Sequence, residues 1–267
     1  MTQQQLWLRR LRPQPQARYR LFCFHYAGGS ASLYRTWPTL LAEMQPTLEV
    51  CAIQLPGREN RLREAPFTQM APLIRSLLAV LRPELDRPFA FFGHSMGALV
   101  AYELAQALQN SGAPLPAHLF VSGRRAPSLP DPMPPLHRLP TDEMLRAIGQ
   151  RYGNLPALLL EDAELKAIYA PLLQADFTLV ETYQPSSLTQ LACSLTALGG
   201  AHDALATEAE LLAWRPLTQS RFAHRLFPGG HFYLQEQTNA LLAHITAQLG
   251  ALPVGNDTSG MTPAQRL

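Results

Sequence analysis

One serine stands in a pattern that could make it a nucleophile. Residues 93–97 read Gly-His-Ser-Met-Gly, a match to the Gly-x-Ser-x-Gly nucleophile elbow. Glycines are required on both sides because the sharp turn holds the serine in a strained conformation with its hydroxyl exposed. The apolar run Phe89–Phe92 precedes the motif, and Ala98–Leu108 reads as a helix. This strand-to-helix context supports the match, so we predict that Ser95 attacks the substrate.

A histidine base must accompany that serine, because a hydroxyl is a weak nucleophile near neutral pH. The best candidate is His231, which follows the last apolar strand in a Pro-Gly-Gly-His-Phe loop. His94 adjoins the nucleophile, but consecutive side chains at such a turn diverge. The other histidines lie within or beside elements and are not expected to act as bases: His25, His118, His137, His202, His224 and His244.

A carboxylate is needed to hold the base in its working tautomer, and in this arrangement it lies between serine and histidine in the chain. Asp203 ends the loop Gly-Gly-Ala-His-Asp after the apolar run 191–198. It is the only carboxylate at that strand end before the helix that contains Glu208. Two alternatives remain open: Asp203 could cap that helix, or Asp131, one strand earlier, could supply the acid.

Two backbone amides should stabilise the negative charge that develops on an attacked carbonyl oxygen. One is the amide of Met96, the residue after the nucleophile. The second should come from the turn His-Tyr-Ala-Gly-Gly at residues 25–29, where we favour the amide of Ala27 over that of Tyr26.

Alternating strands and helices must position these residues. The predicted strands are apolar throughout, which is typical of a parallel sheet covered on both faces, so the fold class is α/β. They are residues 21–25, 48–53, 89–92, 118–122, 191–198 and 222–227, and the helices between and after them include 72–81, 98–108 and 232–249.

The alternation breaks after Gly123, and six prolines within 126–140 lead into helical stretches up to about residue 183. We divide the chain into a core of residues 1–125 and 186–250, an insertion of residues 126–185, and a polar tail of residues 251–267 that we expect to be disordered. Such insertions usually lie over the active site as a lid. The alternative is a helical subdomain that gates nothing.

The composition and charge of the chain limit the partners, cofactors and cellular location that we expect. The chain has 267 residues, 47% of them hydrophobic, and a formal net charge of +2, too small a charge to indicate a nucleic-acid partner. Signal-peptide and membrane-spanning patterns are absent, which favours a cytoplasmic protein, and a monomer is the default expectation. The three cysteines, Cys23, Cys51 and Cys193, lie in apolar segments without metal-type spacing, so we expect inert thiols, no metal and no cofactor.

The motifs, in this order, resemble one known family, the type II thioesterases that accompany nonribosomal peptide and polyketide synthases. The matching segments are 24–32, 55–59, 93–98, 122–127 and 229–234. The resemblance implies an α/β-hydrolase fold and a triad of Ser95, Asp203 and His231. It also implies a substrate, acyl groups held as thioesters on the phosphopantetheine arm of acyl- or peptidyl-carrier proteins, and an editing role in which stalled or wrong groups are hydrolysed. His202 departs from the small or acidic residue more usual before the acid.

We expect two further sets of residues to contact that substrate. Positive charge for the anionic arm and an acidic carrier protein is expected from Arg58, Arg61, Arg63, Arg124 and Arg125, although these could be solvated surface arginines. An acyl site is expected along the helical stripe Leu165, Tyr169, Leu172, Leu173 and Phe177, although such a stripe is more often core. The competing functions are a general carboxylesterase of the same fold and a non-catalytic module that binds carrier proteins.

Overall fold

The computed structural model, which describes residues 3–153 and 155–250, is built around one seven-stranded sheet. The strand order is β1-β3-β2-β4-β5-β6-β7, and all pairs are parallel except β1 with β3. The sheet confirms the α/β class. The strands are β1 (Leu8–Arg9), β2 (Tyr19–Phe24), β3 (Leu48–Ile53), β4 (Phe89–His94), β5 (His118–Ser122), β6 (Ser194–Gly200) and β7 (Phe222–Phe227).

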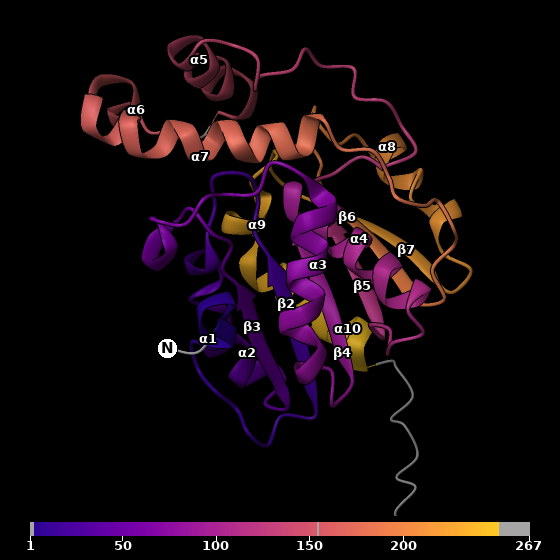
Figure 1. The fold of residues 1–267 in the computed structure, drawn as a ribbon. Helices are drawn as coiled ribbons and strands as arrows, with labels where there is room; N and C mark the ends of the chain where they lie inside the picture. The colour runs from indigo at the N-terminus through magenta and orange to yellow at the C-terminus, as the bar shows by residue number, and fades with distance from the viewer. Residues whose placement is uncertain (1–2, 154, 251–267) are drawn as a thin grey trace, which may run out of the picture.

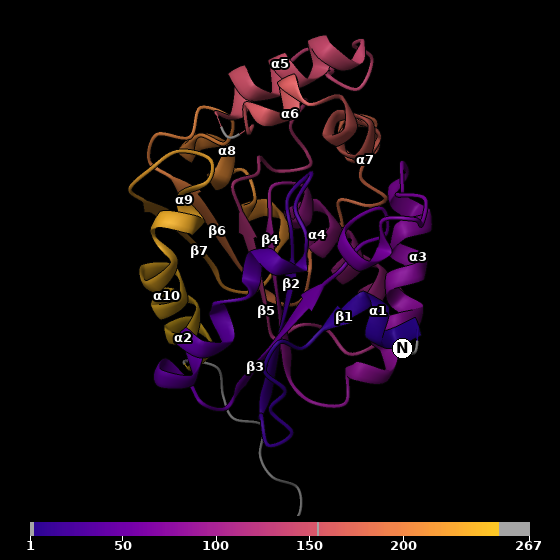
Figure 2. The same cartoon turned by 90° about the vertical axis from the view of Figure 1, so that its left-hand side faces the viewer.

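Helices cover both faces of the sheet, as Figure 2 shows. On one face lie α3 (Met70–Leu81) and α4 (Met96–Asn110), and on the other lie α2 (Trp37–Met44) and α10 (Thr238–Gly250). Two separate hydrophobic clusters fill the two layers. Every residue of β3, β4, β5 and β6 is consequently buried, which explains why these strands are apolar without alternation. The shorter elements are α8 (Glu208–Leu212), α9 (Tyr233–Glu236), η1 (Ala31–Tyr34), η2 (Glu59–Arg61), η3 (Arg82–Glu84) and η4 (Arg215–Leu217).

Between β5 and β6 the chain leaves the sheet and forms α5 (Thr141–Tyr152), α6 (Leu158–Glu161) and α7 (Ala163–Glu181). These helices lie beyond the end of the sheet, at the top of Figure 1. They have a hydrophobic cluster of their own, centred on residues such as Leu145, Ile148 and Phe177. We call residues 126–185 the helical insertion. Because β5 and β6 are parallel neighbours, with Val121 opposite Ala197, the chain leaves the sheet at the carboxyl end of β5 and returns to the opposite end of the sheet to begin β6.

Two regions differ from the sequence prediction. The last helix is two helices, α9 and α10, with the Thr238 hydroxyl donating to the carbonyl of Leu234 at the break (2.8 Å). The N-terminal segment, for which no element was predicted, forms α1 (Gln3–Trp7) and β1, and Trp7 is buried in the core. Arg20 is likewise buried and pairs with Glu49 at 3.1 Å.

Within the described ranges, no helix combines the length and the apolar character needed to cross a bilayer. The tail predicted for residues 251–267 lies outside the described residues.

Candidate active site

The nucleophile elbow forms where β4 ends and α4 begins. Ser95 has a φ of 54° and a ψ of −112°, a conformation that a non-glycine residue rarely adopts. Its amide donates to the carbonyl of Ser122 on the neighbouring strand at 2.8 Å. A Cβ on Gly93 would lie 2.1 Å from the Gly97 carbonyl oxygen, and one on Gly97 would lie 2.1 Å from that of Phe24. Both glycines of the motif are therefore required by close packing of backbone on backbone.

His231 and Asp203 are brought together by two loops at the same end of the sheet. The Nδ1 of His231 lies 2.8 Å from Oδ2 of Asp203, and both side chains are buried. The other carboxylate oxygen, Oδ1, accepts the amide of Leu205 at 2.9 Å. Thr207, rather than Asp203, caps α8 through a capping box with Glu210. The capping role considered for Asp203 is therefore filled by another residue.

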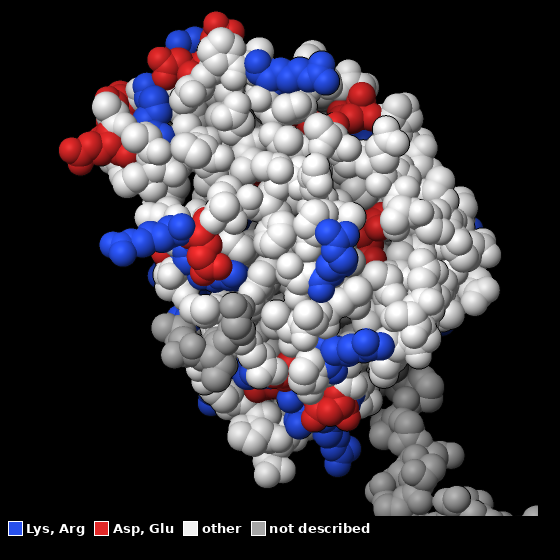
Figure 3. All heavy atoms as spheres, in the orientation of Figure 1, with Lys and Arg blue, Asp and Glu red and all other residues white. Residues whose placement is uncertain are grey.

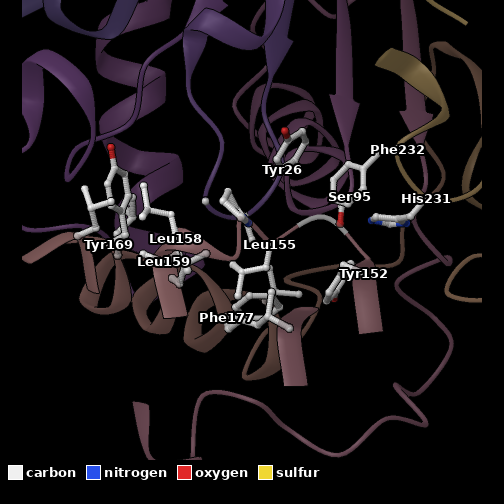
Figure 4. A pocket seen from close by; sticks show the side chains of 18 residues that line it. Tyr26, Ser95, Tyr152, Leu155, Leu158, Leu159, Tyr169, Phe177, His231 and Phe232 are labelled. Atoms are coloured by element: carbon white, nitrogen blue, oxygen red, sulfur yellow. The ribbon is translucent and has the colours of Figure 1, made fainter. Parts of the chain in front are cut away.

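The second nitrogen of His231 is free to act on Ser95. Its Nε2 is buried and makes no hydrogen bond to any described residue. Figure 4 shows the Ser95 hydroxyl beside the His231 ring, and both side chains line one pocket. Catalytic hydrogen bonds are often long before substrate binds, so this contact is compatible with proton transfer in the Michaelis complex. Tyr152 from the helical insertion packs on the imidazole, with ring centroids 5.3 Å apart.

His94 lies next to the nucleophile but is committed elsewhere. Its Nδ1 lies 2.8 Å from the Ser122 hydroxyl, which contacts the Tyr233 hydroxyl at 2.7 Å. Burial holds the pKa of His94 well below the usual value for histidine, and the nearby His231 lowers it further. His94 therefore stays neutral and packs against His231, with ring centroids 5.1 Å apart. It does not serve as the base, as expected from the divergence of the His94 and Ser95 side chains at the elbow.

The turn at residues 26–29 has a fixed backbone. The carbonyl of Tyr26 accepts the amide of Gly29 at 3.0 Å and is 2.8 Å from Nδ1 of His25. Because a trans peptide is planar, the amide of Ala27 must point opposite to that carbonyl. Ala27 and Ser95 line the same pocket, and the amide of Met96 is at the start of α4, where helix amides lack intrahelical partners. Met96 thus follows the nucleophile directly and Ala27 lines the same pocket, while their role as oxyanion donors stays a prediction.

A single apolar pocket of about 550 Å³ opens onto Ser95 and His231 (Figure 4). Twelve of its 18 described lining residues belong to the helical insertion, and none of the 18 is Asp, Glu, Lys or Arg. The whole predicted stripe is among them: Leu165, Tyr169, Leu172, Leu173 and Phe177. The pocket can therefore hold a long apolar group with its reacting carbon at the serine.

Three of the five arginines that were predicted to supply positive charge to the substrate are instead buried. Arg58 and Arg125 are only 3% and 5% exposed, and Arg61 is buried over the Trp7 ring. Arg125 donates to the carbonyls of Pro130 and Leu205, and Arg58 pairs with a carboxylate of α7. Buried guanidinium groups with protein partners cannot supply charge to a docking protein. Figure 3 shows basic and acidic side chains interspersed over the face it displays, without one basic patch.

The other two arginines of the prediction are Arg124 and Arg63. Arg124 is partly buried in a small polar cavity behind the pocket, 3.8 Å from Asp131, whereas Arg63 is exposed. Asp131, the rival acid, is exposed; its carboxylate accepts the amide of Met133 and pairs with Arg124 and Arg125. Sequence reasoning missed Asp176, a buried carboxylate on α7. Its one signal was an acid within an apolar helical stretch.

In the described part of the chain, no three His, Cys, Asp or Glu side chains are grouped to hold a metal ion. The three cysteines are free and buried, and burial raises the pKa of each thiol.

Fold and site together define an α/β-hydrolase with a serine at the elbow and a His–Asp pair facing it. The chain belongs to the thioesterase domain family, whose model matches residues 19–249. Among curated proteins it is 43% identical over 251 residues to a protein of Brevibacillus parabrevis named linear gramicidin dehydrogenase LgrE, covering 93% of this chain and 94% of that one.

Two solved structures share both fold and sequence with the chain. The type II thioesterase BorB from the borrelidin biosynthetic cluster superposes with a TM-score of 0.81 at 36% identity, covering 91% of this chain and 98% of BorB. RedJ, a thioesterase of the prodiginine pathway in Streptomyces coelicolor, gives 0.79 at 40% identity, covering 87% of this chain and 86% of RedJ. The predicted resemblance and fold are thereby confirmed.

Proposed function

We propose that this thioesterase hydrolyses acyl groups from the phosphopantetheine arm of carrier proteins, as an editing enzyme of a nonribosomal peptide or polyketide synthase. The observation that carries the proposal is the apolar pocket that opens onto Ser95 and His231. A thioester carbonyl placed at the serine would leave its acyl chain in that pocket. A further similar structure, YbtT, is a type II thioesterase from the yersiniabactin NRPS/PKS biosynthetic pathway, with a TM-score of 0.78 at 29% identity, and it supports the same substrate class.

The chemistry proceeds in two steps with Ser95 as nucleophile. Nε2 of His231 takes the hydroxyl proton while Ser95 Oγ bonds to the thioester carbon, and the carbonyl oxygen becomes an oxyanion. The amides of Ala27 and Met96 stabilise that charge. The tetrahedral intermediate collapses, the C–S bond breaks and the thiol leaves with the proton from His231. His231 then deprotonates water, which attacks the acyl-enzyme and releases the free acid and Ser95.

Asp203 keeps His231 in the tautomer that this mechanism needs. With Nδ1 protonated and donating to the carboxylate, Nε2 is the unprotonated nitrogen and can accept the serine proton. The buried carboxylate also stabilises the imidazolium that forms transiently. The name of the Brevibacillus relative denotes a dehydrogenase, but this chain has no Gly-x-Gly-x-x-Gly dinucleotide motif, and its site favours acyl transfer.

The helical insertion would act as the lid of this site. Its residues form most of the pocket wall, so acyl groups are selected by the insertion and cleaved by the core. The boundaries of residues 126–185, the cytoplasmic location and the monomeric state stay predictions.

Intact-mass measurement of an acyl-loaded carrier protein tests the function directly. Wild-type enzyme should shift the carrier to the mass of its free-thiol form, and Ser95→Ala should leave it loaded. The same acyl group offered as an oxygen ester separates a thioesterase from a general esterase. A faster reaction with the oxygen ester than with the carrier thioester would contradict the proposal.

A further inference from the structure

The turn that carries the predicted oxyanion donor Ala27 is held from outside by the helical insertion. The amide of Gly28, the next residue along, donates to Oδ2 of Asp176 at 2.7 Å. Asp176 lies on α7, 148 residues away in the chain, and is 2% exposed. One hydrogen bond thus connects the insertion to the peptide that follows Ala27.

Arg58 completes this connection from the loop after β3. Its Nη1 and Nη2 donate to the two oxygens of Asp176 at 2.9 and 2.8 Å, a bidentate pair. The same Nη1 donates to the carbonyl of Gly29 at 3.0 Å, and Nε donates to that of Pro56 at 3.2 Å. The guanidinium therefore joins the core, the turn and α7 at one point.

These contacts leave the turn little freedom on either side of Ala27. The peptide before Ala27 is fixed by the two donors on the Tyr26 carbonyl, His25 and Gly29. Burial lowers the pKa of His25 to about 3, with the charge of Arg58 adding to the effect, so its ring is neutral. Since a carbonyl only accepts, Nδ1 of His25 must be the donor. The peptide after Ala27 is fixed through the amide of Gly28. Among the described residues, Asp176 is the one acceptor of that amide.

Burying this ion pair is expensive, and stability alone does not explain it. Removing two charges from water costs several kcal/mol per ion, and a well-packed apolar pair is often as stable. The neighbours of Asp176 on α7, such as Leu173 and Phe177, are apolar and line the pocket. A carboxylate in that stretch is explained by the amide that it holds.

We propose that Asp176 is a positioning residue for the oxyanion hole, so that α7 must be seated on the 26–29 turn for Ala27 to stabilise the oxyanion. Arg58 neutralises and orients the carboxylate, which would otherwise place a bare negative charge beside the oxyanion. Catalysis is thereby coupled to the position of the helical insertion. The inference rests on the proposed function, in which Ser95 forms a tetrahedral intermediate.

Asp176→Asn tests the proposal with little change in size. Its oxygen can stay on the Gly28 amide and Nη1 of Arg58, but its NH2 group then faces Nη2, donor against donor, so the bidentate pair that seats α7 on the turn is lost. Loss of one oxyanion donor costs about 100- to 1000-fold in kcat, and a misplaced donor less, so we expect a fall of about 10- to 100-fold. The KM for an acyl-N-acetylcysteamine thioester should stay within about twofold, because the acyl pocket is unchanged.

The second readout is the affinity for an alkyl trifluoromethyl ketone, which adds to a serine as a tetrahedral oxyanion. Its Kd should rise by the same factor as kcat falls. Glu181→Gln is the matched control, since Glu181 lies on the same helix and accepts the amides of Leu136 and His137 within the insertion, away from the turn. It should keep wild-type kcat and ketone affinity even if Tm falls.

The proposal is overturned if Asp176→Asn keeps kcat and ketone affinity within twofold of wild type, or if Glu181→Gln loses them equally. If Asp176→Asn does not fold, Arg58→Lys decides by the same criteria, because it keeps the charge but loses the fork that orients Asp176. Wild-type protein that binds the ketone but does not hydrolyse thioesters would count against the proposed function, while the comparison of ketone affinities would still test Asp176.

Discussion

Asp203→Asn is the most informative single change, because the structure determines which way the new amide must face. The amide of Leu205 donates to Oδ1 of Asp203, so the asparagine carbonyl must take that place. The NH2 group then faces His231 where Oδ2 now lies, 2.8 Å from Nδ1. An NH2 group only donates, so Nδ1 must accept and the ring proton moves to Nε2.

His231 would then present a proton to Ser95 instead of a lone pair, and it could no longer act as the base. Wrong-tautomer substitutions of this kind lower kcat by about 10⁴-fold, roughly 5 kcal/mol of transition-state stabilisation. The side chain keeps its volume in a buried site, so the Tm should change by only a few degrees. KM should change little, since Asp203 does not line the pocket.

The assay is release of thiol from an acyl-N-acetylcysteamine thioester, followed with a thiol-reactive chromophore, alongside thermal unfolding of each variant. Asp131→Asn is the control, because it removes the rival carboxylate by the same chemical change, and it should retain activity within about twofold. More than a tenth of wild-type kcat in folded Asp203→Asn, or a large loss in Asp131→Asn, would refute the assignment of the acid.

Three further outcomes are expected. Gly97→Ala should abolish activity or folding, because its Cβ would lie 2.1 Å from a carbonyl oxygen, whereas Gly149→Ala, where the nearest atom is at 3.5 Å, should retain both. Across a series of straight-chain acyl thioesters, kcat/KM should rise up to about fourfold per methylene, from about 0.8 kcal/mol each, until the pocket is full. Burial lowers the pKa of His118 from 6.5 to about 4, so the unfolded chain takes up this proton first and stability should fall from about pH 6.5 to pH 4. Urea titrations of His118→Gln should show that fall reduced by up to about 3 kcal/mol; an unchanged pH dependence would contradict the shift.

Much of the site could be predicted from the sequence because its parts follow strand ends. Ser95 and Asp203 follow continuously apolar strands, and His231 follows the more polar β7; parallel strands bring their carboxyl ends to one edge of the sheet. Strands β2 to β6 were evident because both of their faces are buried, which leaves continuous apolar runs. The pairing of His231 with Asp203 then needed only chain order and sheet direction.

The arginines and the N-terminal segment could not be read in this way. The side chain of Arg58 is buried because Asp176 meets it from 118 residues away, and no local pattern encodes that meeting. β1 has only two residues, too few to show a period, so its antiparallel pairing with β3 leaves no signal. Such features depend on tertiary placement, which spacing along one chain does not specify.

The insertion between adjacent strands β5 and β6 has a consequence for how such enzymes can diversify. The residues proposed to bind the acyl group and those proposed to cleave the thioester come from separate stretches of the sequence. The insertion forms most of the pocket wall, while the core carries Ser95, Asp203 and His231. A chimaera that exchanges residues 126–185 should inherit the acyl range of the donor and the chemistry of the recipient. Such a chimaera must keep the contacts between insertion and core, among them the carboxylate of Asp176 with Arg58, the Tyr183 hydroxyl with Glu103 and the ring of Tyr152 with His231.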